Sequence, residues 1–304
     1  MTANKTTGLH HITAICSTPK ENKHFYTKVL RLYFVKNTVN HDDPSTYHLY
    51  YGDKEASPGL LMTFFTWTHL PTATRGVGET SRTLFGVPKN SFGFWKEHLK
   101  KQQVVFEEVT NAFNKQQLHF SDPHGLPLGL QEQESPLTNT STLDKEVAIN
   151  GFCGVELTVR TASATASALR TLGYEEEANK ENKYLFINKQ ASFAKEITII
   201  ENKELPAARQ GVGSIHHVAF GIEADKQEEF LQELVSKRYH ASPIINRVYF
   251  KSIYFREPQG VLFEVATNGP GFYEDEEELG STFVLPPHLE PRRQEIINNL
   301  PPLN

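Results

Sequence analysis

Apolar residues recur at every third or fourth position in four segments of the chain, at residues 19–30, 91–102, 162–172 and 225–237. This period is typical of helices that bury one face. Short stretches rich in β-branched and aromatic residues flank each segment, and such a composition favours strands. The alternation predicts one unit of the order β-α-β-β-β, repeated along the chain.

Two local signatures support this repeat. Residues 8–12 (GLHHI) and 214–218 (SIHHV) both place a histidine pair before a β-branched residue. Residues 119–125 (HFSDPHG) and 254–260 (YFREPQG) share the form aromatic-x-acid-Pro-x-Gly. Proline presets φ at the start of a turn and glycine supplies freedom at its end, so the flanking strands should fold into a hairpin. We therefore expect four units, at about residues 8–66, 80–132, 151–202 and 213–267.

The length of 304 residues exceeds the size at which a single core stops growing, so two domains are expected. Residues 134–150 are rich in Ser, Thr, Asn and Pro and are interpreted as a linker. An N-terminal domain of units 1 and 2 would then occupy residues 1–133, and a C-terminal domain of units 3 and 4 residues 151–267. Residues 268–304 have no partner in the repeat and form a tail.

The composition and charge limit the classes of partner that the protein is expected to bind. Hydrophobic residues make up 38% and charged residues 22% of the chain, which is typical of a folded globular protein. The net charge of -5 and the absence of a long basic run argue against nucleic acid and anionic membranes as partners, and favour a small molecule. Two cysteines are too few for a disulfide scaffold, and no segment has the apolar length of a signal peptide or membrane span. The cytoplasm is the expected compartment.

The second half carries a candidate metal site. His217 lies on the predicted opening strand of unit 4, and Glu264 on its closing strand within the apolar run 260–266 (GVLFEVA). A carboxylate there is costly unless it is paired or binds a metal. In the alternative interpretation, Glu264 pairs with an internal Arg or Lys and His217 is a hydrogen-bonded core histidine. Their joint occurrence in one unit favours ligands, since two histidines and a carboxylate suit an Fe(II) oxygenase.

The repeat indicates where the third ligand lies. Unit 3 has Gly154 at the position of His217, and glycine has no side chain to bind a metal. Unit 1 instead offers His11. The position of Glu264 is occupied by Thr63 in unit 1 and by a glycine in unit 2, so one site is expected rather than several. That site would be shared between the two halves of the chain.

The histidine-pair openings, the two turn motifs and the tail with GPGF and LPPHLEPRR resemble the glyoxalase/bleomycin-resistance/dioxygenase superfamily, also called vicinal oxygen chelate proteins. Within it, the chain is similar to four-module, hydroquinone-specific ring-cleaving dioxygenases over essentially its whole length. The resemblance implies an α+β fold of four βαβββ modules in two domains, which form open, curved mixed-sheet barrels with helices outside.

The resemblance also implies a cofactor and a set of site residues. Fe(II) would be bound by His11, His217 and Glu264, although Mn(II) or Zn(II) in purified protein would suit the same ligands. The residues implied to act around the metal are His10, Thr13, His216, Arg247 and Tyr254. Catechol-cleaving members carry their two histidines on units 3 and 4, and Gly154 departs from that pattern.

Strand alternation tests these positions in part. Thr13 shares a face with His11, whereas His10 and His216 alternate away from their ligating neighbours. They would reach the site only at a strand bulge, or act by supporting the ligands.

Arg247 and Tyr254 are seven residues apart, so an unbroken strand would place them on opposite faces. A turn near residues 245–247 would bring them to one side. The alternatives are that Tyr254 fills the barrel as an apolar ring and that Arg247 makes a surface ion pair.

The expected function is Fe(II)-dependent, extradiol-type cleavage of an aromatic diol by O2, with a hydroquinone as the favoured diol and a homo-oligomer as an open option. Two other functions remain open on the same scaffold, because a fold does not determine chemistry. One is a glyoxalase-like metal-dependent isomerase or lyase. The other is a metal-free, drug-sequestering protein of the bleomycin-resistance type.

Overall fold

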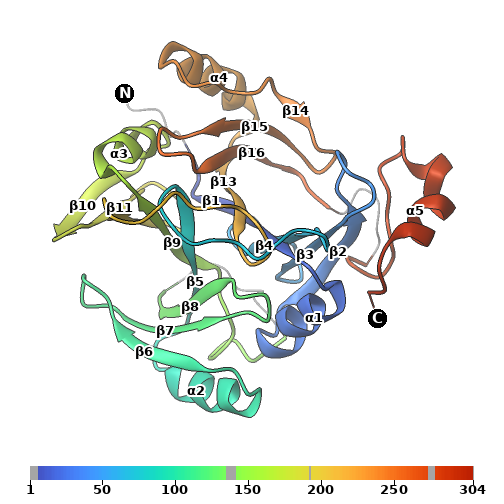
Figure 1. Ribbon diagram of the computed structural model, residues 1–304, viewed down its shortest axis with the longest axis horizontal. Coiled ribbons are helices and arrows are strands. Elements are labelled where there is room, and N and C mark those ends of the chain that lie inside the picture. The colour runs from blue at the N-terminus through green and yellow to red at the C-terminus, as the bar shows by residue number, and fades with distance from the viewer. Residues whose placement is uncertain (1–5, 135–141, 192, 273–277, 304) are drawn as a thin grey trace.

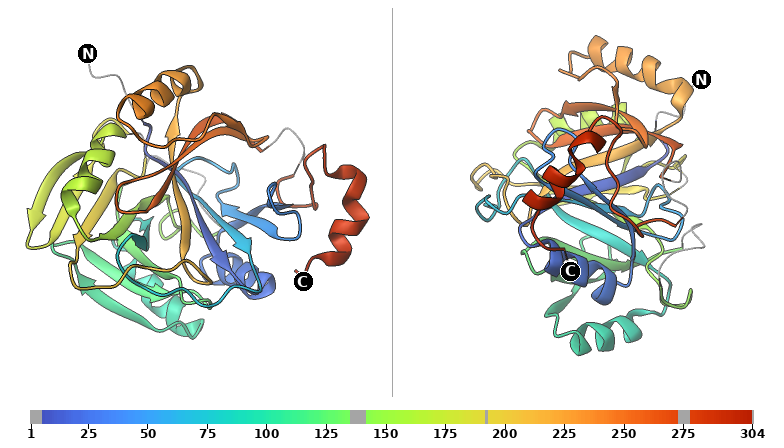
Figure 2. Two further views of the ribbon diagram at one scale, coloured as in Figure 1. Left: turned by 45° about the horizontal axis from the view of Figure 1, so that its top comes forward. Right: turned by 90° about the vertical axis from the view of Figure 1, so that its right-hand side faces the viewer.

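The computed structural model describes residues 6–134, 142–191, 193–272 and 278–303. It consists of two eight-stranded mixed sheets with helices on the outside (Figure 1). Helices α2 (Phe92–Lys101) and α4 (Gln227–Ser236) lie at opposite ends of the molecule, as the second view also shows (Figure 2). The α+β class and the curved mixed sheets are as predicted.

Each predicted unit contributes four strands. Unit 1 comprises β1 (Leu9–Cys16), β2 (Tyr33–Val39), β3 (Tyr47–Gly52) and β4 (Leu61–Thr66). Unit 2 comprises β5 (Glu79–Val87), β6 (Phe106–Thr110), β7 (Gln116–Ser121) and β8 (Pro127–Glu132). Unit 3 comprises β9 (Phe152–Val159), β10 (Glu175–Lys180), β11 (Lys183–Ile187) and β12 (Glu196–Glu201). Unit 4 comprises β13 (Ile215–Ile222), β14 (Ile245–Asn246), β15 (Phe250–Arg256) and β16 (Leu262–Pro270).

A helix follows the first strand of every unit, as the periodicity predicts. In unit 1, α1 (Pro19–His24) continues as a π-helical segment (Phe25–Val29), and in unit 3 the helix is α3 (Ala162–Thr171). A 3-10 turn (Ala224–Lys226) precedes α4. The tail adds a second 3-10 turn (Glu290–Arg292) and α5 (Arg293–Asn299). Among the described residues, no helix has both the length and the apolar character needed to cross a membrane.

The sheets combine units from both halves of the chain. One sheet has the order β14-β15-β16-β13-β1-β4-β3-β2 and so joins units 4 and 1, while the other joins units 3 and 2 in the order β10-β11-β12-β9-β5-β8-β7-β6. The first and last strands of a unit pair in parallel, and units meet through antiparallel pairs, β1 with β13 and β5 with β9. The division into domains 1–133 and 151–267 remains a prediction.

The central strands are buried on both faces. All eight residues of β1 are buried, because one face lines the inside of the curved sheet and the other packs in a core shared with the second sheet. That core includes Ile12 and Val218 from the first sheet and Phe85 and Val155 from the second. The two sheets therefore form one packed body.

The repeated turn motif works through its acidic residue. One oxygen of Asp122 accepts the backbone N–H groups two and four residues further along, at 2.8 and 2.9 Å. Glu257 does the same at the other turn, at 2.9 and 3.0 Å. The following glycines, Gly125 and Gly260, have φ of 78° and 104°, a conformation that residues with a Cβ rarely adopt. The motif thus closes each hairpin by hydrogen bonds and backbone freedom.

The tail packs against the edge of the first sheet. The N–H of Val284 donates to the carbonyl of Asn37 on β2 at 2.9 Å. Leu285, Leu289 and Ile296 form an apolar cluster with Val39 on the same strand. The tail therefore covers the otherwise unpaired edge of β2 (Figure 1).

Asp122→Ala should lower the free energy of unfolding by about 1–3 kcal/mol, because two buried N–H groups lose their acceptor. Chemical denaturation followed by circular dichroism measures the change. The matched control is Glu97→Ala, which removes an exposed carboxylate from α2 and should change stability little. Equal effects of the two substitutions would refute the structural role of the acid in the motif.

Candidate metal centre

Paired bulges in the β1–β13 ladder turn both histidine pairs toward one side. His11 lies opposite Ala219 and Thr13 opposite His217, with register shifts next to His10 and His216. At a bulge, one extra residue interrupts the alternation of faces. Adjacent histidines can therefore lie together instead of on opposite faces of the sheet. The bulge considered from the sequence is present on both strands.

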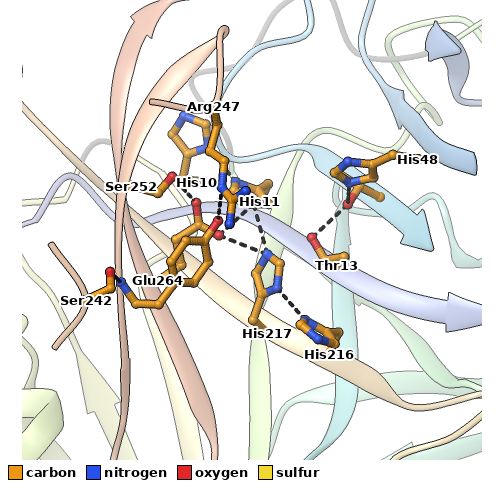
Figure 3. A network of polar contacts seen from close by, with 12 residues as sticks. His10, His11, Thr13, His48, His216, His217, Ser242, Arg247, Ser252 and Glu264 are labelled. Carbon is orange, nitrogen blue, oxygen red and sulfur yellow. Dashed lines mark hydrogen bonds and ion pairs between the residues drawn. The ribbon is translucent and has the colours of Figure 1, made fainter. Parts of the chain in front are cut away.

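Three donor atoms converge at the floor of the curved sheet. His11 Nε2 and His217 Nε2 are 3.3 Å apart, and they lie 3.3 and 2.9 Å from Glu264 Oε2 (Figure 3). β1, β13 and β16 supply one residue each, and all three side chains are buried. Among the described residues, these three are the His, Cys, Asp or Glu side chains that lie close enough together to hold one metal ion.

The geometry fits a facial metal site. Bonds of about 2.1 Å at right angles to one ion would separate neighbouring donor atoms by about 3 Å, close to the observed spacings. Glu264 Oε2 is buried and has no hydrogen-bond partner of acceptable geometry among the described residues, although both imidazoles lie close. The other oxygen, Oε1, accepts the hydroxyl of Ser252. One carboxylate oxygen is thus anchored and the other is directed toward the two nitrogens.

Electrostatics favour the charged carboxylate. Burial alone would raise the pKa of Glu264, but the attraction of His11 and His217 outweighs burial and holds the pKa well below its usual range. Burial lowers the pKa of His217. An ionised carboxylate and a neutral imidazole are the forms that bind a divalent cation.

His10 and His216 each contact one of the two candidate ligand histidines, His11 and His217. The Nδ1 atoms of His10 and His11 are 2.9 Å apart, and those of His216 and His217 are 2.8 Å apart. A hydrogen bond at Nδ1 fixes the ring and leaves Nε2 free for a metal. Burial, followed by the neighbouring ligand histidine, lowers the pKa of both His10 and His216 to about 3. His216 also lines the pocket, whereas His10 does not.

Thr13 does not line the pocket but is linked to it by a chain of polar contacts through Thr63 and His48. Its Oγ1 is 2.7 Å from Thr63 Oγ1, which lies 3.0 Å from His48 Nε2. The hydroxyl of Tyr50 lies 2.8 Å from His48 Nδ1. His48 and Tyr50 line the pocket and were not predicted, because a single histidine in the apolar strand β3 has no local signature of function.

Arg247 and Tyr254 meet across a turn. β14 ends at Asn246 and β15 begins at Phe250, and the intervening turn brings Arg247 Nε to 3.2 Å from Tyr254 Oη. Val248 within this turn has φ 73°, a strained conformation for a β-branched residue. Both side chains line the pocket. The turn expected from their spacing is therefore present.

The donor atoms open into a pocket of about 390 Å³. Its walls are largely aromatic, with Phe65, Trp67 and Phe250 among them, and the loop 40–43 covers one side. This size and character suit a single aromatic ring. Like His48 and Tyr50, this loop was not predicted from the sequence, because it belongs to unit 1 and reaches the site only where the sheet curves.

The second sheet has no matching metal site among its described residues. It repeats the bulged pairing, with shifts next to Ser81 and Cys153. At the positions of the ligand histidines it has Arg82, which pairs with Glu156 at 3.3 Å, and Gly154. A Cβ at Gly154 would lie 2.2 Å from the carbonyl oxygen of the neighbouring strand, so a larger residue has no room there.

Comparisons with known proteins agree with the fold. The family described as the Glyoxalase/Bleomycin resistance protein/Dioxygenase superfamily matches residues 8–130. The Bacillus subtilis protein named "Putative ring-cleaving dioxygenase MhqE" is 41% identical over 98% of this chain and 100% of its own length. Its counterpart MhqO, similarly named, is 38% identical over 99% of this chain and 97% of its own length.

A further relative and two solved structures extend the comparison. The "Chlorohydroquinone/hydroquinone 1,2-dioxygenase" of Sphingobium indicum is 30% identical over 96% of this chain and 95% of its own length. The crystal structure of the "putative dioxygenase from Bacillus subtilis subsp. subtilis str. 168" matches with a TM-score of 0.93 at 36% identity over 99% of both chains. Glyoxalase I from Zea mays shares the fold, with a TM-score of 0.62 at 13% identity over 86% of this chain and 92% of its own.

The fold and the site define a protein of the vicinal oxygen chelate type, and the chain belongs to the glyoxalase/bleomycin resistance protein/dioxygenase superfamily. Its relatives place it among the ring-cleaving dioxygenases, so it is an oxidoreductase.

His11→Ala should reduce bound divalent metal from about one ion per chain to less than roughly a tenth of that, because one of three protein ligands is lost. Metal content after anaerobic loading and desalting measures the effect, and circular dichroism checks the fold. His240→Ala, an exposed histidine, is the control. Full metal content in His11→Ala would mean that β1 does not contribute a ligand.

Proposed function

We propose that the protein is an Fe(II)-dependent, extradiol-type dioxygenase that cleaves the ring of a hydroquinone. The carbon–carbon bond beside one hydroxyl-bearing carbon breaks, and both atoms of O2 enter the product. The observation that carries the proposal is the convergence of His11 Nε2, His217 Nε2 and Glu264 Oε2 at the floor of an aromatic pocket. Two histidines and one carboxylate on one side of a metal are typical of non-haem Fe(II) oxygenases.

A relative's name supports hydroquinone as the substrate, and the state of the two cysteines supports the cytoplasm as the compartment. The relative at 30% identity is named for chlorohydroquinone and hydroquinone, and it aligns along nearly the whole chain. Cys16 and Cys153 are free and buried thiols, in agreement with a reducing cytoplasm as the compartment.

Iron held by the three ligands would lower the pKa of a phenolic hydroxyl and give the ring and O2 a common electronic path. The protein's own part is to position the ring. Phe65, Trp67 and Phe250 would pack against it and exclude water. His10 and His216 would keep the ligand imidazoles oriented through their Nδ1 contacts.

Tyr254 is the proposed proton donor. It lies opposite Glu264 on the neighbouring strand, and its ring centroid is 5.8 Å from that of His217. Burial raises its pKa, so the phenol keeps its proton at neutral pH. Arg247 Nε donates to Tyr254 Oη and so fixes the direction of the hydroxyl. Arg247 would also stabilise negative charge that develops on the ring during cleavage.

Hydroquinones should be cleaved with a kcat/KM at least about tenfold above that for catechol. A para-diol that approached the metal through one hydroxyl would extend its second hydroxyl across the pocket, whose wall includes polar groups such as His48 and Asn40. Oxygen uptake after anaerobic iron loading, measured for both diols, tests the prediction. Equal or better efficiency with catechol would refute the choice of para-diols and leave ring cleavage standing.

Tyr254→Phe should lower turnover by about 10²- to 10⁴-fold, the usual contribution of a general acid or base. Metal content and hydroquinone affinity should stay unchanged, because the ring remains and only the hydroxyl is lost. Tyr184→Phe on β11 of the other sheet is the control. Unchanged turnover would mean that Tyr254 only lines the pocket and donates no proton. Loss of metal would mean that the ligand set is incomplete.

A further inference from the structure

The pocket has an unbalanced set of charges. Arg247 is the one permanently cationic side chain among the described residues that line it, whereas Asp42, Asp43 and Glu264 are acidic. Burial, together with Arg247, lowers the pKa of His41 in the pocket to about 4, so this histidine adds no positive charge at neutral pH. A metal at the floor would take up the charge of Glu264. The lining would then keep two carboxylates, those of Asp42 and Asp43, and one guanidinium.

Asp42 engages that guanidinium. Arg247 Nη1 lies 2.9 Å from Asp42 Oδ2, and Arg247 Nε already donates to Tyr254 Oη at 3.2 Å. The Asp42 side chain is 72% exposed, whereas that of Arg247 is only 21% exposed. The ion pair therefore lies at the opening of the pocket and joins the loop after β2 to the turn before β15. It offsets the positive charge that would otherwise attract an anion.

Asp43 adds a fixed negative charge beside this pair. Its carboxylate accepts hydrogen bonds from Trp67 Nε1 at 3.0 Å and from the hydroxyl of Thr46 at 2.9 Å. These contacts, with those of Ser45, outweigh partial burial and lower the pKa of Asp43. The carboxylate is thus held in place and charged. The wall also has apolar and aromatic parts, including Phe65, Phe250 and Leu262, and uncharged polar groups such as Asn40 and His48.

We infer that Asp42 is a specificity-determining residue that excludes hydroquinones with an anionic ring substituent. The inference rests on the proposed function and specifies its substrate class as para-diphenols with uncharged, apolar substituents. Asp42 acts by neutralising Arg247 and by repelling a substituent carboxylate together with Asp43. Selectivity built on an unfavourable interaction with the wrong ligand is a general device of binding sites.

Anaerobic titration calorimetry of the iron-loaded protein tests this without turnover. The ligands are 2,5-dihydroxyphenylacetate and its methyl ester, which share the ring and differ in charge. The native protein should bind the ester at least about tenfold more tightly, and Asp42→Asn should reduce this ratio by roughly an order of magnitude. Asp42→Glu should retain the preference. Asp225→Asn, which neutralises an exposed carboxylate far from the pocket, should also retain it.

The outcomes separate the two proposals. If the native protein binds the acid as tightly as the ester, Asp42 has no role in selectivity and the proposed function stands. The same conclusion follows if Asp42→Asn leaves the ratio of the two affinities unchanged. If neither diphenol binds the native protein, the proposed function fails and the inference falls with it. Oxygen uptake with the same pair should follow the same ratio, through KM rather than kcat, because Asp42 acts on binding.

Discussion

The antiparallel pairing of β1 with β13 is the contact on which the candidate metal centre depends. It joins strands from the two halves of the chain, and its two bulges direct both histidine pairs to one side of the sheet. Without the bulges, His10 and His216 could not lie beside the rings they support. The second sheet retains the same bulged pairing but has an arginine and a glycine at the ligand positions. The same backbone arrangement therefore occurs in both sheets, and the capacity to bind a metal depends on a few side chains.

The buried carboxylate of Glu264 is the costly element of this arrangement. An ionised group in a protein interior is strongly destabilising unless charges or hydrogen bonds compensate for lost water. Ser252 and the two imidazoles provide part of that compensation, and one carboxylate oxygen retains no hydrogen bond among the described residues. A divalent cation would supply the remainder. The same residue would then serve both folding and catalysis.

The sequence predicted much of the fold, because the information is local. Helical periodicity located the helices, and the acid-Pro-x-Gly turns located the hairpins, since each depends on neighbouring residues. Internal comparison of the units also led to His11 as the partner of His217, because Gly154 cannot bind a metal. The structure brings these side chains together with Glu264, although metal binding itself stays a prediction.

Other features had no local signal. Which unit pairs with which depends on long-range packing, and the sheets join units 1 and 4 rather than consecutive units. His48 and Asp42 reach the pocket only through the curvature of the first sheet. Strand alternation alone would have excluded His10 and His216, because a bulge cannot be read from residue types.

The pairing of the first unit with the last has a consequence for biosynthesis. The ribosome makes β1 early and β16 some 250 residues later, with Glu264 following His11 by 253 positions. Units 2 and 3 can pair while the chain still grows, and the strands of unit 1 can pair with one another, but the second edge of β1 must wait for β13, which is not yet translated. Non-local contacts of this kind are slow to form and leave apolar edges exposed meanwhile. A chain truncated before residue 264 can therefore complete the second sheet, yet it can never assemble the centre.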